Sequence, residues 1–429
     1  MRYKYIFKLF VFLILSIFNI IWSRINDVNL STVNKSEFDV TVIGYCLYSD
    51  GLGRLPIGFI ENFKDKININ FIVSRFVPVN AKENFSRVNN IKSIIEGNNK
   101  TPGNVSILFD ALWKDKSKKF PDIPNSIINI AYSMFESTKI PDEWVSFLND
   151  NFDSVVVPSP FLINVYKKCG VIIPIFLFPH GIYIDDFLDM PIKSKKNHPF
   201  VFGCFANFAP HKNQKLLLKS FINKFKNNPN VILRLYGGGN IASCGIYDIL
   251  NKECPENVEI ITNCLSPEEY LKAFSSIDCC VVLSKAEGFS VRPREAIALG
   301  IPTILSNNTA HKPLCKTPYF IPVKSNIKEV ADYTSIFGDY YGYNFNCSQE
   351  DVEKTLEEVY NNYEYYLNRS KQGRYWVNMF KYEYLEKKYL NLVKPDKIIL
   401  GSKDLITDEY IMTSSKSLYE KYLLIKSFH

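Results

Sequence analysis

The segment between residues 277 and 306 constrains the fold more strongly than any other part of the chain. It begins with IDCCVVLS (residues 277–284), a mostly apolar run that is typical of a strand buried on both faces. After a loop, Pro293 suits the first turn of a helix and Gly300 suits its end. IPTILS (residues 301–306) then predicts a second strand. Strand, loop, helix and strand in this order indicate a parallel α/β sheet, and the loop opens where such sheets bind ligands.

Two carboxylates, Glu287 and Glu295, flank this loop eight positions apart. The loop predicts a binding site for an anion such as a phosphate. Its donors would be the backbone N–H groups of Gly288, Phe289 and Ser290, together with the positive end of the helix dipole. A carboxylate beside that site would accept hydrogen bonds from neutral hydroxyls, as the acidic residue of a dinucleotide fold does with a ribose. The pattern therefore describes a nucleotide-sugar site. The alternative is an ordinary first-turn helix acid at Glu295 and a solvated loop residue at Glu287.

Three longer stretches resemble the motifs of group 1 (family 4) glycosyltransferases. EGFSVRPREAIALGIPTI (residues 287–304) resembles their E-x7-E signature. FGCFANFAPHKNQKLLLKSF (residues 202–221) is similar to their G-R-L-x-x-x-K block. VVVPSPFLINVYKKCGVIIPIFLFPHGI (residues 155–182) is similar to the link between the two halves of these enzymes. The matches run in a consistent order from about residue 39 to residue 322.

The resemblance implies an α/β protein of GT-B fold, with two doubly wound Rossmann-like domains facing a cleft. It also implies a retaining glycosyltransferase of the hexosyltransferase type, which moves a sugar from a nucleoside-diphosphate sugar to a glycan, lipid-linked or protein acceptor. No cofactor and no metal are expected. Two other classes stay open: a catalytically degenerate sugar-nucleotide-binding protein, and an NAD-dependent oxidoreductase. The oxidoreductase is less favoured because neither GLGRLP nor YGGGN is a dinucleotide fingerprint.

The resemblance also implies roles for individual residues. Lys212 and Glu287 are the catalytic candidates: Lys212 would neutralise the leaving diphosphate and Glu287 would hold sugar hydroxyls. Glu295 would hold the ribose. Asn207, Lys212 and the amides of residues 288–290 complete the predicted donor site, where preorganised charges and N–H groups would stabilise the departing diphosphate.

One position departs from the family pattern within this donor site. Asn207 stands where the family has a phosphate-binding arginine. His211, Arg292 and Arg294 are the candidates to replace it, and Arg294 occupies a position that is usually apolar in the family. This departure favours the degenerate alternative, together with the absence of a histidine before His180.

The acceptor side is predicted to lie in the first half of the chain. Gly51 and Gly53 follow an expected strand and would let the backbone approach a ligand, although a simple turn explains them equally well. The earliest histidine is His180, so the acceptor-side histidine of many family members has no counterpart. Glu136 is the candidate polar group on that side, with a loop-edge carboxylate as the alternative.

Composition fits a globular chain with two α/β domains. Of 429 residues, 46% are hydrophobic, and the net charge of +7 has no cluster dense enough to indicate nucleic-acid binding. The ten cysteines include no C-x-x-C pair and no zinc-ligand spacing, so we expect free thiols, which favours a reducing compartment. No D-x-D motif indicates a metal-bridged diphosphate.

The domain organisation follows from these motifs. Past Val323 we expect tyrosine-rich helices. The predicted parts are a membrane anchor or signal segment (1–24), an acceptor-side domain (38–184), a linker (185–198), a nucleotide-sugar-binding domain (199–345), C-terminal helices that cross back to the first domain (351–394) and an unassigned tail (395–429).

The N-terminal segment predicts association with a membrane. LFVFLILSIFNIIW (residues 9–22) is uncharged and mostly apolar, and three basic residues precede it. No small-residue cleavage site follows, so an uncleaved anchor is favoured over a cleaved signal peptide. The basic residues would place the following domains across the membrane, whereas free thiols favour the reducing side, and a helix lying in the interface would remove this conflict. The side of the membrane stays open.

Overall fold

The computed structural model describes residues 36–47, 51–74, 86–97, 101–112, 114, 119–226, 228–239, 241–253, 255–263 and 265–393. The predicted N-terminal anchor and the unassigned C-terminal tail both lie outside the described residues. Within the described ranges, no helix combines the length and the apolar character that crossing a membrane requires. The eight cysteines in these ranges are all free thiols.

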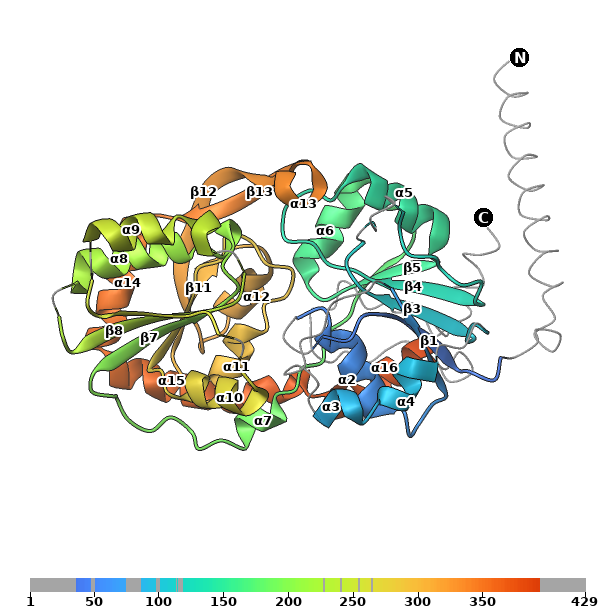
Figure 1. The fold of residues 1–429 in the computed structure, drawn as a ribbon, viewed down its shortest axis with the longest axis horizontal. Coiled ribbons are helices and arrows are strands. Elements are labelled where there is room, and N and C mark those ends of the chain that lie inside the picture. Colours follow the sequence, from blue (N-terminus) through green and yellow to red (C-terminus); the bar gives the residue numbers. More distant parts are fainter. Residues whose placement is uncertain are drawn as a thin grey trace, which may run out of the picture.

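The described chain forms two α/β lobes that lie side by side (Figure 1). The first lobe contains a six-stranded parallel sheet in the order β2-β1-β3-β4-β5-β6. Its strands are largely buried runs of apolar residues, as parallel strands covered on both faces should be. The strands are β1 (Val40–Gly44), β2 (Ile69–Val73), β3 (Val105–Phe109), β4 (Ile128–Tyr132), β5 (Ser154–Val157) and β6 (Ile175–Leu177).

Helices connect these strands in the manner of a doubly wound fold. In α6, Pro160 lies in the first turn and Gly170 ends the helix in the left-handed conformation, as both residues favour. The helices of this lobe and of the following connection are α2 (Arg54–Phe63), α3 (Ser86–Asn89), α4 (Lys92–Gly97), α5 (Asp142–Asn151), α6 (Pro160–Cys169) and α7 (Asp185–Leu188).

The second lobe contains a seven-stranded sheet in the order β13-β12-β11-β10-β7-β8-β9. All its pairs are parallel except β12 with β13. The strands are β7 (Phe200–Phe205), β8 (Val231–Tyr236), β9 (Val258–Ile261), β10 (Cys279–Val282), β11 (Thr303–Asn307), β12 (Ile321–Tyr333) and β13 (Asp339–Cys347). Together the two sheets confirm the predicted α/β class.

Helices cover the second sheet and continue into the C-terminal part of the chain. The predicted helix with Pro293 in its first turn is present as α11. The helices are α8 (Gln214–Phe225), α9 (Ile246–Glu253), α10 (Pro267–Ser275), α11 (Arg292–Ala298), α12 (Lys312–Cys315), α13 (Thr334–Phe337), α14 (Gln349–Asn361), α15 (Tyr363–Trp376) and α16 (Tyr382–Val393).

The last helix, α16, packs on the first lobe although it follows the second in sequence. Tyr389 lies in the first-lobe core, with its ring 5.9 Å from Phe59 and 5.4 Å from Phe63 of α2. The Tyr389 hydroxyl accepts a hydrogen bond from the Gly181 amide at 3.0 Å. Tyr382 and Tyr389 of this helix are therefore core residues of the first lobe.

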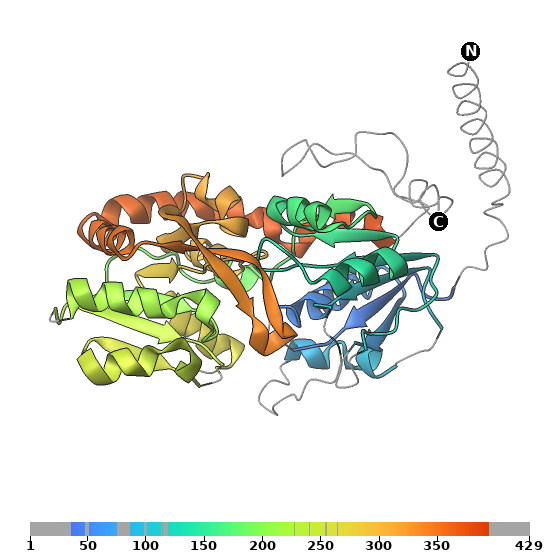
Figure 2. The same ribbon diagram turned by 90° about the horizontal axis from the view of Figure 1, so that it is seen from above.

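The chain directly after Val323 differs from the expectation of helices. Residues 324–347 contain a long β-hairpin with one helical turn, α13, at its tip, and the tyrosine-rich helices begin only at Gln349. In β12 buried and exposed residues alternate over much of its length, which is the pattern of a half-buried strand. We call residues 325–347 the interdomain arm, because the hairpin leaves the second lobe and reaches the first (Figure 2).

Candidate active site

Strand order determines where a ligand crevice opens in each lobe. In the second sheet the chain adds β7, β8 and β9 in one direction, and β10, β11 and β12 lie on the other side of β7. The sheet therefore reverses between β7 and β10, and a crevice opens outside the carboxyl ends of these strands. The loops after β7 and β10 carry Lys212 and Glu287. In the first sheet the reversal lies between β1 and β3, and Gly51 and Gly53 follow β1.

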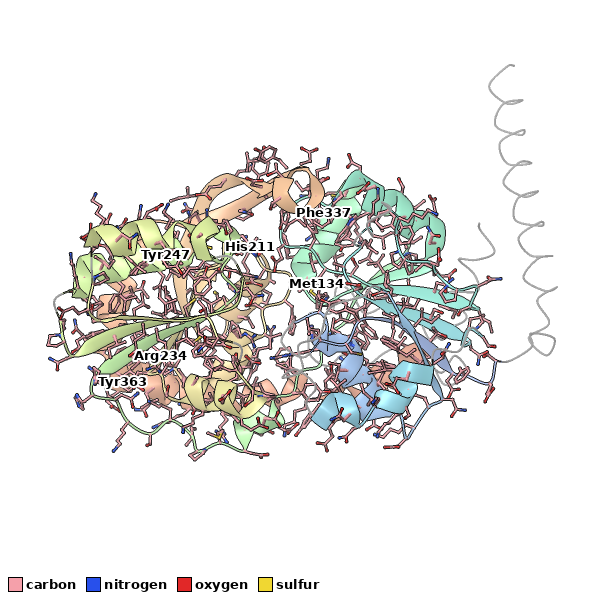
Figure 3. All side chains as sticks on the ribbon, in the orientation of Figure 1. Met134, His211, Arg234, Tyr247, Phe337 and Tyr363 are labelled. Atoms are coloured by element: carbon pink, nitrogen blue, oxygen red, sulfur yellow. The ribbon has the colours of Figure 1, made fainter. Side chains whose placement is uncertain are left out.

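Lys212 joins carboxylates from both lobes. It ends a short helical turn, and Asn213 behind it adopts a left-handed φ of 65° at the start of α8. The Lys212 Nζ lies 2.8 Å from Glu287 Oε1 and 2.9 Å from Glu136 Oε1. The second Glu136 oxygen lies 3.0 Å from the Nε2 atom of His211. The structure thus brings the two catalytic candidates and the acceptor-side candidate into one cluster; Figure 3 labels His211.

The charges in this cluster stabilise one another. Burial by itself raises the pKa of the Glu136 carboxyl, but Lys212 and His211 outweigh that effect and hold this pKa well below its usual range. Burial likewise disfavours the charged form of Lys212, yet Glu136 and Glu287 together raise the Lys212 pKa above its usual value. Glu136 and Lys212 are therefore both ionised at neutral pH.

The loop after Glu287 presents backbone amides without partners. Within the part of the chain that the structure describes, no hydrogen bond is donated by the amides of Gly288, Phe289 or Ser290. Ser290 adopts a left-handed φ of 70°, and its hydroxyl lies 2.8 Å from the Nε2 atom of His311. Three unpaired amides in one short loop provide donors for an anion.

Arg294 contacts this loop through its backbone carbonyls and the Phe289 ring. Its Nη1 atom donates hydrogen bonds to the carbonyl oxygens of Phe289 at 3.0 Å and Ser290 at 2.6 Å. The guanidinium lies 3.8 Å from the centre of the Phe289 ring and 4.4 Å from that of Phe380. Burial lowers the Arg294 pKa to about 9, and among the described residues no carboxylate forms an ion pair with it. Arg294 is thus oriented toward the loop carbonyls, and this corrects its candidacy as a direct replacement for the phosphate-binding arginine.

His180 is a buried member of this region that the sequence analysis left without a role. Its ring stacks on Phe289 with a centroid distance of 5.0 Å and an interplanar angle of 13°. Its Nδ1 atom is buried and has no hydrogen-bond partner within the described structure. Burial, with the nearby Arg294 and Arg54, lowers the His180 pKa to about 3, so the ring is neutral.

Glu295 lies in a second polar cluster and is only 2% exposed. Its carboxylate accepts hydrogen bonds from Arg292 at 2.8 Å, from the Tyr270 hydroxyl at 2.9 Å and from Arg54 at 3.3 Å. Burial raises the Glu295 pKa, but Arg292 and Arg54 outweigh it and the net pKa is lowered. Arg292 pairs with this glutamate, so it too is not a free phosphate ligand in this structure. A ribose hydroxyl would have to join this cluster or displace one of its members.

Arg54 and Tyr270 are the members of this second cluster that the sequence analysis missed. Arg54 begins α2 in the first lobe and directly follows the glycine-rich loop, which was the signal available for it. Tyr270 lies in α10, and nothing in the local sequence pairs it with Glu295. Because Arg54 and Glu295 are 241 residues apart, only the tertiary structure shows their contact.

The remaining candidates differ in their surroundings. Gly53 packs so closely on Leu47 that a Cβ there would lie 2.5 Å from the Leu47 carbonyl oxygen, which explains the glycine by packing alone. Gly51 is exposed and has open space around it. Asn207 is exposed just after β7, and its carbonyl oxygen accepts a hydrogen bond from Gln214 at 2.9 Å. None of these three touches the Lys212 cluster through a described hydrogen bond.

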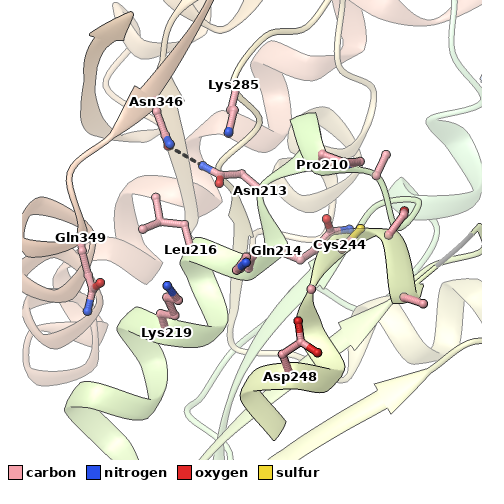
Figure 4. Close-up of a pocket in the computed structure, with 15 residues that line it drawn as sticks. Pro210, Asn213, Gln214, Leu216, Lys219, Cys244, Asp248, Lys285, Asn346 and Gln349 are labelled. Carbon is pink, nitrogen blue, oxygen red and sulfur yellow. Dashed lines mark hydrogen bonds between the residues drawn. The ribbon is translucent and has the colours of Figure 1, made fainter. Parts of the chain in front are cut away.

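A cavity of about 560 Å³ lies in the second lobe next to the turn that carries Lys212, with Pro210 and Asn213 among its lining residues (Figure 4). It opens over the first turn of α8 and is lined by Lys215, Lys219 and Lys285 among other residues. Neither Lys212 nor Glu287 lines it. The cavity is therefore a neighbour of the site and not part of it.

Comparison with known families identifies the second lobe. Residues 186–335 match the family model described as glycosyl transferases group 1. This part of the chain is similar to the group 1 glycosyltransferases. The match covers the loops that carry Lys212, Glu287 and Glu295, so the predicted recognition is confirmed. A comparison with curated proteins found no match.

Solved glycosyltransferase structures share the architecture of both lobes. Sucrose-phosphate synthase from Thermosynechococcus elongatus is 13% identical, with a TM-score of 0.58, over 82% of this chain and 97% of that chain. HepE from Anabaena, solved with UDP and glucose, is 10% identical, with a TM-score of 0.54, over 82% and 99%. WaaG, a glycosyltransferase of lipopolysaccharide biosynthesis, is 12% identical, with a TM-score of 0.55, over the same shares. At these identities the likeness shows the GT-B fold alone.

Proposed function

We propose that the protein is a retaining family 4 glycosyltransferase that moves a sugar from a nucleoside-diphosphate sugar to an acceptor hydroxyl. One observation carries the proposal: Lys212 lies beside Glu287, and the three unpaired amides of residues 288–290 follow it in the loop after β10. A partly buried cation and unpaired N–H groups at a topological switch point suit a diphosphate. The complexes of HepE with UDP and glucose agree with a nucleotide-sugar donor for this fold.

In the proposed reaction the donor diphosphate lies between Lys212 and the loop amides. Negative charge grows on this diphosphate as the bond to the sugar breaks, and the cation and the N–H dipoles stabilise it without having to reorganise. Because they supply the positive charge, no metal is required, and we expect turnover to persist in the presence of EDTA. Glu287 accepts hydrogen bonds from the sugar hydroxyls, and Glu295 holds the ribose.

Glu136 is then the residue that meets the acceptor. In the structure it shares Lys212 with Glu287, so a donor phosphate would compete with Glu136 for the same ammonium group. A Glu136 carboxylate released in this way can accept a hydrogen bond from the attacking hydroxyl. Its second oxygen lies 3.0 Å from His211, and this contact still favours the ionised carboxylate when Lys212 turns to the phosphate.

The acceptor is a glycan, a lipid-linked sugar or a protein, and the N-terminal segment would hold the enzyme at a membrane. A catalytically degenerate sugar-nucleotide-binding protein is the second candidate. Asn207 favours it, because an exposed asparagine supplies no charge where the family has an arginine.

Two measurements test the proposal in sequence. Saturation-transfer NMR with UDP-, GDP- and ADP-sugars, and with NAD as the control, identifies the donor. A turnover assay with the donor that binds then separates an enzyme from a binding protein. Binding of NAD without any nucleotide sugar would refute the proposal, and binding of a nucleotide sugar without hydrolysis or transfer would favour the degenerate alternative.

A further inference from the structure

The interdomain arm connects the two lobes by a route separate from the linker and α16. β12 pairs with β11 up to Lys324, opposite Asn307, and from Ser325 onward it pairs only with β13. The hairpin therefore projects beyond its own sheet. In Figure 1 it spans from the second lobe to α5 of the first, where Phe337 contacts Trp144.

The tip of the arm belongs to the core of the first lobe. Ala331 is fully buried, and Tyr333 is 8% exposed, in the apolar cluster that contains Phe135 and Trp144. The Tyr333 ring lies 4.9 Å from Phe135, and the Phe337 ring meets Trp144 edge-on at 5.7 Å. Figure 3 shows Phe337 at this end of the arm. Aromatic contacts of this kind resist separation of the two lobes.

The edge of the arm holds the backbone next to Glu136. The Thr138 amide donates to the Tyr343 carbonyl at 3.3 Å, and the Tyr343 amide donates to the Thr138 hydroxyl at 2.9 Å. The Ser137 hydroxyl donates to the Tyr341 carbonyl at 2.5 Å. Since the tip also packs on the residue before Glu136, the arm contacts the chain on both sides of this glutamate.

The base of the arm holds the loops of the second lobe that carry the other site residues. Glu329 accepts hydrogen bonds from Lys285 at 2.6 Å and from the Asn346 amide at 2.8 Å. The Asn346 side-chain oxygen in turn accepts one from Asn213 at 2.8 Å. Asn213 directly follows the site lysine, and Lys285 lies two positions before Glu287.

We propose that the interdomain arm is a positioning strap, which holds Glu136 against Lys212 and keeps the lobes at the separation that the cluster requires. The contacts of Glu136 with Lys212 and His211 cross the boundary between the lobes, and relative domain motion is the default where nothing opposes it. A displacement of about 1 Å at such a contact can cost a hundredfold in rate. The catalytic part of this inference rests on the proposed function, whereas the mechanical part does not.

Gly342 offers a variant that undocks the arm without touching the site. Its φ is +67°, and a Cβ there would lie 2.6 Å from the Lys139 amide nitrogen and from the Thr138 hydroxyl. Gly342→Val should therefore push the arm off residues 137–139. Tyr340→Ala is the matched control, because Tyr340 lies on the same arm and is 56% exposed. Thr138→Val removes only the hydroxyl that binds Tyr343, and it serves if the glycine variant does not fold.

The experiment combines a mechanical and a catalytic measurement. We expect Gly342→Val to increase the radius of gyration in small-angle X-ray scattering and to speed amide exchange at Thr138. Turnover should fall by roughly ten- to hundredfold. The Kd for the nucleoside diphosphate that the NMR screen identifies should not rise by more than about twofold, because Glu136 competes with the phosphate for Lys212. Tyr340→Ala should match the wild type in every measurement.

The outcomes separate this inference from the proposed function. Unchanged scattering and exchange in Gly342→Val would overturn the strap. An undocked arm with full turnover would overturn the positioning of Glu136. A wild-type protein without nucleotide-sugar turnover refutes the proposed function instead, and the scattering and exchange measurements still decide the mechanical part.

Discussion

Replacement of Lys212 by methionine tests the central cluster most directly. The substitution keeps most of the side-chain volume but removes the charge that contacts both Glu136 and Glu287. The two carboxylates then repel each other, because no cation lies between them. We expect a loss of stability together with a loss of turnover, for two different physical reasons.

The loss of stability follows from burial. Removing one partner of a fully buried ion pair costs about 3–5 kcal/mol, and exposed pairs contribute about 0.2–1 kcal/mol. The side chains of Lys212, Glu287 and Glu136 are 16%, 10% and 32% exposed, which places the cluster between these limits. We therefore expect the free energy of unfolding at pH 7 to fall by about 1–3 kcal/mol in urea denaturation.

The pH dependence has a definite sign. In the wild type the Glu136 pKa is lower in the folded state than its ordinary value of 4.5. That group therefore stabilises the fold above pH 4.5, and this contribution is lost as the pH falls through the lower, folded pKa. In Lys212→Met the cation that contributes most to lowering the Glu136 pKa is absent, so most of this stabilisation is missing at neutral pH. The difference in stability between wild type and variant should be largest near pH 7 and should shrink as the pH falls below 4.5.

A second substitution separates stability from catalysis. Lys212→Met with Glu136→Gln should regain most of the lost stability, because no pair of facing carboxylates remains. Turnover should stay at least about a hundredfold below wild type in both variants, since the charge at the leaving diphosphate is absent. If Lys212→Met alone is as stable as the wild type at pH 7, or if its loss of stability does not change with pH, this account of the cluster is refuted.

Further predictions address the remaining parts of the site and the N-terminus. Glu295→Gln should weaken binding of the free nucleoside diphosphate and of the intact donor equally, by about 1.5–3 kcal/mol. Glu287→Gln should instead leave diphosphate affinity nearly unchanged and lower turnover. Calorimetric titration of both variants with both ligands tests this difference, and equal effects from the two variants would contradict it. Arg294→Met removes the hydrogen bonds to the carbonyls of Phe289 and Ser290 and should weaken diphosphate binding by about 1–2 kcal/mol. The unfolding free energy should change by less than about 1 kcal/mol, because a buried charge without an ion-pair partner is removed as well. A large loss of stability with normal binding would make Arg294 a structural residue only. Deletion of residues 1–23 should release the protein into the soluble fraction with donor binding intact, and a truncated protein that still pellets with washed membranes would place the membrane contact elsewhere.

Local sequence was sufficient for the elements that form the crevice. The apolar run of β10 reflects burial on both faces of the strand. Pro293 suits the first turn of α11, where no backbone N–H is needed. The glycine after this helix adopts the left-handed conformation that ends it. The resemblance to group 1 glycosyltransferases rests on the same short stretches. The position of Lys212 and Glu287 on neighbouring crevice loops therefore followed from the sequence.

The partners of these residues were decided by the tertiary structure. Glu136 meets Lys212 across 76 residues, and Arg54 meets Glu295 across 241. An ion pair depends on distance in space, and neither residue type nor spacing encodes it at such separations. For the same reason the sequence predicts Arg294 as a candidate phosphate ligand, whereas in the fold its guanidinium contacts two carbonyl oxygens and two aromatic rings.

The interdomain arm shows the same division most clearly. Its alternation of buried and exposed residues is a strand signal, yet Tyr333 is buried by Phe135, a residue of the other lobe. A pattern of this kind states which side chains must be covered, but not what covers them. The sequence by itself determined the α/β class and the loops that carry the donor candidates. Only the packing of one lobe on the other determined which carboxylates share Lys212, because burial and Coulomb energy depend on neighbours that the chain brings together only when it folds.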